Sequence, residues 1–107
     1  MNLHNVIANL IEAQNNHDSH AYAQCFTPTA VVFDEGKTHT GVAAIQKWIE
    51  EADQKYQSVM KPVSYKESNG ENILTAEVSG TFPGSPALLH FHFGLNNGLI
   101  QSLSVTG

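Results

Sequence analysis

The chain has 107 residues, enough for one domain and too few for two ordinary ones. Hydrophobic residues make up 41% and can build a core, whereas charged residues make up only 14%, so we expect an oligomer to cover part of the surface. The net charge is −5 and the 5 basic residues are scattered lysines. Binding to nucleic acid or to an acidic membrane surface is therefore not expected, because both need clustered cations.

The single cysteine, Cys25, cannot form an internal disulfide bond. The N-terminal residues lack the positive start and apolar run of a secretory signal peptide. No stretch approaches the roughly 20 apolar residues of a membrane span. These features predict a cytoplasmic protein.

Apolar residues near the N-terminus recur at the spacing of one helix face. They are Leu3, Val6, Ile7, Leu10 and Ile11, and Gln14 continues the stripe. Helix propensity drops at residues 15–17, so the helix is expected to end there. Asp18 or Ser19 is expected to cap a second, shorter helix. On that helix Tyr22 and Phe26 are expected to pack on one face, before residues 27–29 (TPT) end it.

A short buried strand is predicted next, at residues 30–34 (AVVFD). Residues 35–41 are predicted to form a loop. A third helix follows, because apolar residues again have helical spacing. These residues are Ile45, Trp48, Ile49, Ala52 and Tyr56.

The second half of the chain changes to a period of two, which predicts four long strands joined as antiparallel hairpins. Turns are predicted at Asn69-Gly70, at residues 82–86 (FPGSP) and at residues 96–98 (NNG). Polar residues, histidines and a few apolar residues such as Leu88 and Ile100 are expected on the outer face. The inner face is expected to collect Leu74, Val78, Phe82, Leu89, Phe91, Phe93, Leu103 and Val105. Segregated helices and antiparallel strands indicate the α+β class.

The order of these elements resembles that of the nuclear transport factor 2-like superfamily. The stretches that carry the resemblance are residues 22–32 (YAQCFTPTAVV), residues 41–49 (GVAAIQKWI) and residues 97–100 (NGLI). The resemblance implies a single SnoaL-like domain over residues 1–107. It also implies a cone-shaped fold, in which three N-terminal helices pack on a curved antiparallel sheet around a small-molecule pocket.

Asp34 lies where ketosteroid isomerase and SnoaL-like enzymes of this superfamily resemble each other in carrying an aspartate general base. The isomerase's two oxyanion donors are not matched, since they fall near Leu10 and Phe91. Such donors commonly supply several kcal/mol of transition-state stabilisation, so the resemblance does not favour steroid isomerase activity.

Asp34 follows an apolar strand, and an apolar environment would raise the pKa of its carboxyl toward that of a useful base. The alternative is a turn aspartate that is hydrogen-bonded to the loop. His39, in the predicted loop, could reach over the pocket and form an acid–base pair with Asp34. The alternative for His39 is an exposed loop residue.

Aromatic residues are predicted to line the pocket. Trp48 and Tyr56 would form its roof, and the Tyr22 hydroxyl would orient a ligand, although each could instead be an ordinary core residue. The inner sheet face would add further ligand-binding rings, from Phe82, Phe91 and Phe93.

His90 and His92 point the same way on one strand, as a metal site would require. They fall on the outer face without an evident third ligand, so no metal site is predicted. The sequence has no glycine-rich phosphate loop, no Cys-x-x-Cys and no Gly-x-Ser-x-Gly motif, and no cofactor is predicted.

Three functions remain open. The chain could be an enzyme that uses Asp34, aided by His39, to move a proton on a small apolar or carbonyl-bearing molecule. Isomerase, cyclase, dehydratase and hydrolase chemistry all fit that description. It could instead bind such a molecule without chemistry, or serve as a dimerisation domain whose pocket is filled by its own side chains. A homodimer joined through the outer sheet face is expected in all three cases.

Overall fold

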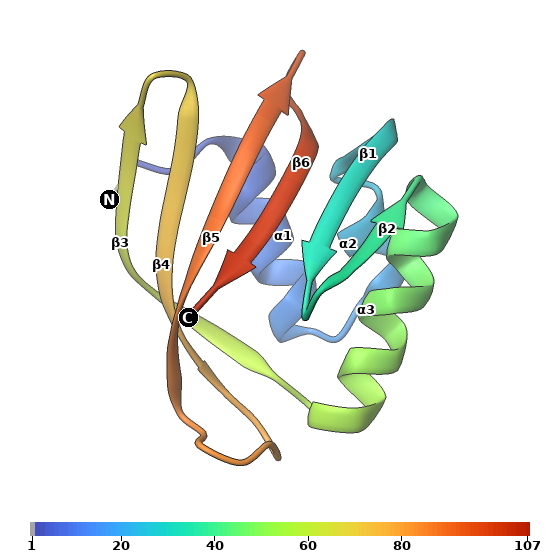
Figure 1. Cartoon of the computed structure of the whole chain (residues 1–107), viewed down its shortest axis with the longest axis vertical. Helices are drawn as coiled ribbons and strands as arrows, with labels where there is room; N and C mark the ends of the chain where they lie inside the picture. The colour runs from blue at the N-terminus through green and yellow to red at the C-terminus, as the bar shows by residue number, and fades with distance from the viewer. Residues whose placement is uncertain (1) are drawn as a thin grey trace.

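The computed structural model describes residues 2–107 as an α+β fold with three helices on one side of a curved, open sheet of six strands (Figure 1). The helices are α1 (Asn5–Asn15), α2 (Ser19–Ala23) and α3 (Val42–Tyr56). The strands are β1 (Phe26–Asp34), β2 (Lys37–Thr40), β3 (Val59–Ser68), β4 (Glu71–Ser79), β5 (Ala87–Asn96) and β6 (Leu99–Thr106). No helix among these residues is both long and apolar enough to cross a membrane.

The strand order in the sheet is β2-β1-β6-β5-β4-β3. The expectation of a purely antiparallel sheet was wrong, because β1 and β6 pair in parallel. After β2 the chain forms α3 and continues into β3 at the far edge. It then returns through hairpins, so that β6 arrives beside β1 in the same direction (Figure 1). Only two of the three helices precede the sheet in the chain, since α3 follows β1 and β2.

The start of α2 agrees with its predicted cap, because Asp18 accepts a hydrogen bond from the Ala21 N–H at 3.0 Å. The helix ends at Ala23, however, and Phe26 is the first residue of β1 rather than part of the helix. The rings of Tyr22 and Phe26 still pack together, with their centroids 5.7 Å apart. The predicted contact is therefore present in a different local structure.

Strand β1 is longer than predicted, and β2 occupies the segment predicted as a loop. Glu35 and Gly36, with φ of 52° and 75°, form a two-residue turn that pairs Asp34 with Lys37. The short β2 has no apolar alternation by which the sequence could reveal it. Its pairing with β1 makes it a strand.

Ile100 was expected on the outer face but is fully buried. The reason is a bulge in β6: Gly94 pairs with Ser102 and Leu95 pairs with Ile100, which leaves Gln101 as an extra residue. An extra residue reverses the alternation of side chains beyond it. The Gln101 side chain then bonds to β1, where its Oε1 accepts from the Thr27 hydroxyl at 2.8 Å.

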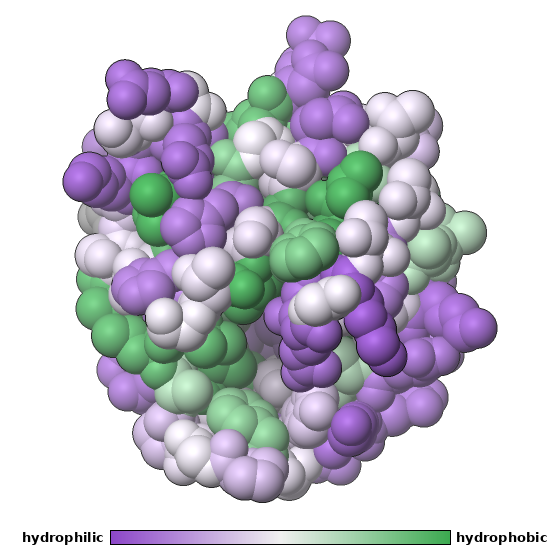
Figure 2. All heavy atoms as spheres, in the orientation of Figure 1, coloured by the Kyte–Doolittle hydropathy of each residue, from purple (hydrophilic) through white to green (hydrophobic). Residues whose placement is uncertain are grey.

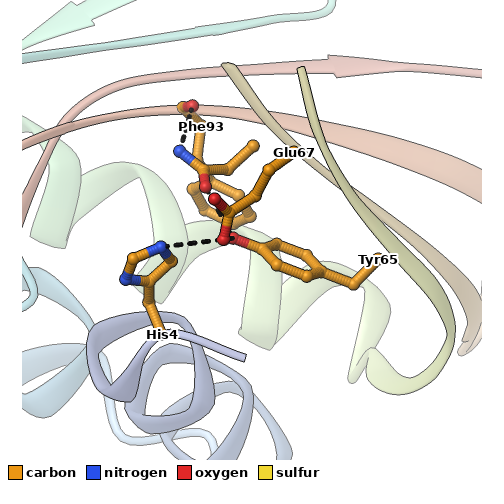
Figure 3. A network of polar contacts seen from close by, with 5 residues as sticks. His4, Tyr65, Glu67 and Phe93 are labelled. Carbon is orange, nitrogen blue, oxygen red and sulfur yellow. Dashed lines mark hydrogen bonds and ion pairs between the residues drawn. The ribbon is translucent and has the colours of Figure 1, made fainter. Parts of the chain in front are cut away.

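A chain of polar contacts ties the start of α1 to the β3–β4 hairpin (Figure 3). The Tyr65 hydroxyl donates to Asn72 Oδ1 at 2.6 Å and lies 3.3 Å from Glu67 Oε1, which is 3.1 Å from His4 Nε2. Asn72 Nδ2 in turn donates to the Phe93 carbonyl at 3.5 Å. Burial, followed by the Glu67 carboxylate, raises the pKa of Tyr65 to about 12, so the hydroxyl keeps its proton and serves as a donor.

The end of β4 approaches the end of α3 very closely at Gly80. The Thr81 N–H donates to the Tyr56 carbonyl at 2.7 Å, and a Cβ on Gly80 would lie only 2.5 Å from that carbonyl oxygen. The approach also brings the rings of Tyr56 and Phe82 into edge contact at 6.0 Å. Gly80 thus lets the helix and the sheet meet at one end of the space between them.

Gly80→Ala is expected to lower the free energy of unfolding by about 1–3 kcal/mol, because the methyl group must push two backbones apart. Urea denaturation measures this. Gly94→Ala is the matched control, since the one atom that its Cβ would clash with is the Ser102 hydroxyl oxygen, at 2.5 Å, which can rotate away. Equal losses in the two variants would contradict the prediction.

Candidate functional site

A cavity of about 500 Å³ lies between the helices and the inner face of the sheet, within the size range of small-molecule sites. Most of its wall is aromatic or aliphatic, and a few polar groups interrupt it. The lining residues are Gln14, Tyr22, Asp34, Glu35, Trp48, Ala52, Asp53, Tyr56, Ser58, Met60, Val78, Phe82, Pro83, Leu89, Phe91 and Val105.

Asp34 lines the cavity from the end of β1. Its side chain shares a sheet face with that of Val32, which is fully buried, because the two residues are two apart on one strand. Burial raises the pKa of the Asp34 carboxyl, and the neighbouring Glu35 carboxylate adds to the increase. A hydrogen bond from the Glu35 backbone and the charge of His39 oppose it. The environment therefore favours a carboxyl that holds its proton more tightly than a surface aspartate does.

A second carboxylate, Asp53, enters the cavity from α3. Gln14 Nε2, from α1, donates to Asp53 Oδ1 at 3.1 Å and to the Ser58 carbonyl at 2.9 Å. Burial raises the pKa of Asp53, whereas the hydrogen bond from Gln14 and the charge of His17 lower it. Gln14 thus holds a partly buried acid in a fixed position between three segments of the chain.

Tyr22 is 3% exposed, and its hydroxyl makes no hydrogen bond to any other residue in the 2–107 range. The side chain lines the cavity, and its ring packs against Trp48 with centroids 6.2 Å apart. Burial raises the pKa of Tyr22 strongly, followed by the charges of Cys25, Asp34 and Asp53. The hydroxyl therefore stays protonated, close enough to both aspartates to feel their charge.

His39 does not line the main cavity. Its ring stacks on Trp48 at 5.5 Å and lines a smaller hollow of about 170 Å³, which shares Asp34, Trp48 and Tyr56 with the main cavity. No hydrogen bond joins His39 to Asp34 in the described part of the chain. The histidine is thus placed at the rim, behind Trp48, where its charge acts on Asp34 from a distance.

The other predicted site residues divide between cavity and core. Trp48, Tyr56, Phe82 and Phe91 line the cavity as expected. Phe93 does not: it is fully buried in the core, stacked beside Phe91 with ring centroids 6.5 Å apart.

Sequence reasoning missed Asp53 and Gln14 as site residues. A signal was present for each. Gln14 is a polar residue in the apolar stripe of α1, and Asp53 follows the buried Ile49 by one helical turn. Each polar residue on a buried helix face requires a partner, and here they are partners of each other.

The outer-face histidines are engaged with neighbouring strands. His90 Nδ1 lies 2.9 Å from the Thr75 hydroxyl, and His92 lies between Glu71 at 2.9 Å and Thr106 at 3.0 Å. No group of three or more metal-ligating side chains occurs within residues 2–107.

Asp34→Asn is expected to raise the thermal unfolding midpoint at about pH 7, with a gain that shrinks as the pH is lowered to about 4. The folded chain raises the pKa of Asp34, so its stability is greatest below the pKa of the unfolded chain and falls as the pH rises through the folded-state pKa. Asparagine stays neutral and escapes this loss. Thermal unfolding followed by circular dichroism at each pH measures the difference in midpoint, and Glu77→Gln, at an exposed position, is the control. A midpoint for Asp34→Asn below that of the wild type at neutral pH would contradict the prediction.

Comparisons with known proteins agree with this geometry at the level of fold and family. No protein-family model and no curated protein matches the chain. Among solved structures, a candidate polyketide cyclase, protein SMa1630 of Sinorhizobium meliloti, is 34% identical with a TM-score of 0.93. The match covers 97% of this chain and 95% of that one.

Two more distant structures share the fold alone. A protein of Catenulispora acidiphila with a ketosteroid isomerase-like fold, in complex with trimethylamine, is 15% identical with a TM-score of 0.85, over 96% of this chain and 85% of that one. The epoxide hydrolase/cyclase-like enzyme SalBIII is 20% identical with a TM-score of 0.79, over 94% and 85% of the two chains. By its fold and its 34% identity to SMa1630, the chain belongs to the nuclear transport factor 2-like superfamily, among its SnoaL-like members.

Proposed function

We propose that the chain binds a small, largely apolar molecule in the 500 Å³ cavity and that Asp34 transfers a proton on it. The observation that carries this proposal is the position of Asp34, which ends β1 inside a cavity walled mainly by aromatic and aliphatic groups. The reaction class is that of an isomerase, cyclase or dehydratase, each of which begins when a bound carbonyl-bearing or cyclic ligand loses a proton to a base; the proton then returns at another atom in an isomerisation, protonates the oxygen of the newly closed ring product in a cyclisation, or leaves with the hydroxyl group as water in a dehydration.

The chemistry follows from the surroundings of the carboxyl. Burial raises the pKa of Asp34, so the ionised form is a stronger base than an exposed aspartate. Most of the wall is apolar, which limits the water around the ligand, and Asp34 is proposed as the lining carboxylate that takes the proton. His39 is proposed to act through its charge, and by holding Trp48, rather than as a direct acid–base partner.

Several members of this fold with known structures are described as cyclase or isomerase-like proteins, and one holds a small molecule. These descriptions support a small-molecule site in this chain without naming its ligand.

The second candidate function is binding without chemistry. The isomerase's oxyanion-donor positions carry Leu10, which is fully buried, and Phe91, and neither side chain can donate a hydrogen bond to an oxyanion. The third hypothesis, a pocket filled by its own side chains, is disfavoured by the volume of the cavity.

A homodimer is expected through the outer face of the sheet. That face shows apolar patches among polar side chains (Figure 2), and Phe33 and Leu88 are exposed large residues on it. Light scattering at micromolar concentration is expected to give the mass of two chains, because these apolar side chains gain by burial. The mass of one chain would remove the expectation.

Proton transfer can be tested without knowing the natural ligand. Small cyclic ketones and related fragments that bind by ligand-observed NMR would be incubated with the protein in deuterated water. Wild-type protein is expected to speed deuterium incorporation into at least one bound ketone, and Asp34→Asn is expected to reduce that rate by about 100-fold or more. Mass spectrometry measures the label, and Glu77→Gln, on the outer face of β4, is the control. Exchange that survives in Asp34→Asn would contradict the role of Asp34, and binding without exchange would favour the second candidate.

A further inference from the structure

The charged groups that line the cavity all have one sign. Asp34, Glu35 and Asp53 contribute carboxylates, and no lysine or histidine is among the lining residues. Lys37, Lys55 and His39 line the smaller hollow behind Trp48 instead, and His17, whose charge acts on Asp53, is outside the cavity lining. A ligand in the main cavity therefore meets three carboxylates in the wall and no cationic side chain among the residues that line it.

The rest of the wall suits a cation as well. Tyr22, Trp48, Tyr56, Phe82 and Phe91 place five aromatic rings around one space. The face of an aromatic ring attracts a cation, most strongly where water is excluded.

The Tyr22 hydroxyl is an independent indication of a ligand group. It is a polar atom on a side chain that is 97% buried, it lies in the cavity wall, and no described residue satisfies it. No side-chain nitrogen or oxygen of the described residues is both buried and without a partner, so the Tyr22 hydroxyl oxygen is open to the cavity, where a ligand can bond to it. A group that donates a hydrogen bond to this oxygen, close to Asp34 and Asp53, would supply the missing partner.

Other ligand charges fit less well. An anionic ligand would be repelled by the carboxylates, and a neutral one would leave them uncompensated in a partly dry cavity. A positively charged donor satisfies the Tyr22 hydroxyl and the carboxylates at once.

We propose that the ligand is an organic ammonium ion, an apolar amine whose N–H groups meet the Tyr22 hydroxyl and the Asp34 and Asp53 carboxylates while its hydrocarbon part packs on the surrounding rings. This inference rests on the proposed small-molecule function and names the chemical class of its ligand. Asp53 becomes a binding residue that selects charge, and Gln14 is the positioning residue that holds it.

Three probes with one ring and different head groups test the charge preference: 2-phenylethylammonium, 2-phenylethanol and 3-phenylpropanoate. Titration calorimetry or NMR titration at neutral pH measures each dissociation constant. The ammonium probe is expected to bind about tenfold or more tightly than the alcohol, and the carboxylate probe about tenfold or more weakly than the alcohol. The three probes share nearly the same apolar area, so the head group accounts for the difference.

Variants test which side chains cause the preference for the ammonium probe. Asp53→Asn keeps an oxygen for Gln14 and is expected to weaken ammonium binding about tenfold, with alcohol binding nearly unchanged. Tyr22→Phe is expected to act in the same direction without a change in charge, and Glu77→Gln, which removes a carboxylate from the outer face, is expected to leave all three affinities unaltered. Circular dichroism confirms that each variant is folded.

The outcomes separate this inference from the function on which it rests. The ammonium proposal would be overturned if 2-phenylethanol bound as tightly as 2-phenylethylammonium. It would also be overturned if neither Asp53→Asn nor Tyr22→Phe changed the dissociation constant of the ammonium probe. Asp34-dependent deuterium exchange could still hold in that case. If none of the three probes binds, both the ammonium proposal and the proposed apolar pocket fail.

Discussion

The polar end of α1 holds the first residues of β3, and the cavity depends on this contact. The Asn15 side-chain amide bonds twice to the backbone of Met60, donating to its carbonyl at 3.0 Å and accepting from its N–H at 2.7 Å. One residue earlier, Gln14 bonds to the Ser58 carbonyl and to Asp53. Loss of these bonds would leave partly buried polar groups unpaired, at a cost of about 1 kcal/mol each. The same bonds hold Ser58 and Met60, which both line the cavity, in place against the end of α1.

The site carries an electrostatic cost that a packed core would not. Burial raises the pKa of both Asp34 and Asp53, which means that their charged forms are disfavoured where they stand. On the outer face, in contrast, His92 has a partner at each ring nitrogen. Titratable groups with shifted pKa values that gather in one cavity are typical of functional sites. In such a site a bound ligand supplies the interactions with the charged groups that the fold alone does not supply.

Prediction from the sequence succeeded where local periodicity and turn chemistry decide the structure, and failed where pairing decides it. The stripe of α1, the Asp18 cap and the Asn69-Gly70 turn are local and are confirmed. Strand β2 lacks apolar alternation and exists because β1 offers it a partner. The prediction that Ile100 lies on the outer face was wrong because Gln101 forms a bulge in β6. The Gln101 side chain bonds to Thr27, 74 residues away in the chain.

The sequence by itself determined the α+β class, the hairpin order and the position of Asp34 after an apolar strand, because each depends on residues that are neighbours in the chain. Only the tertiary structure decided that Asp53 and Gln14 share the cavity, that Phe91 lines it while Phe93 does not, and that His39 stands behind Trp48. It also decided the parallel pairing of β1 with β6. These features arise from contacts between segments that are far apart in the chain. No local sequence pattern encodes the register of such segments or the faces that they turn toward each other.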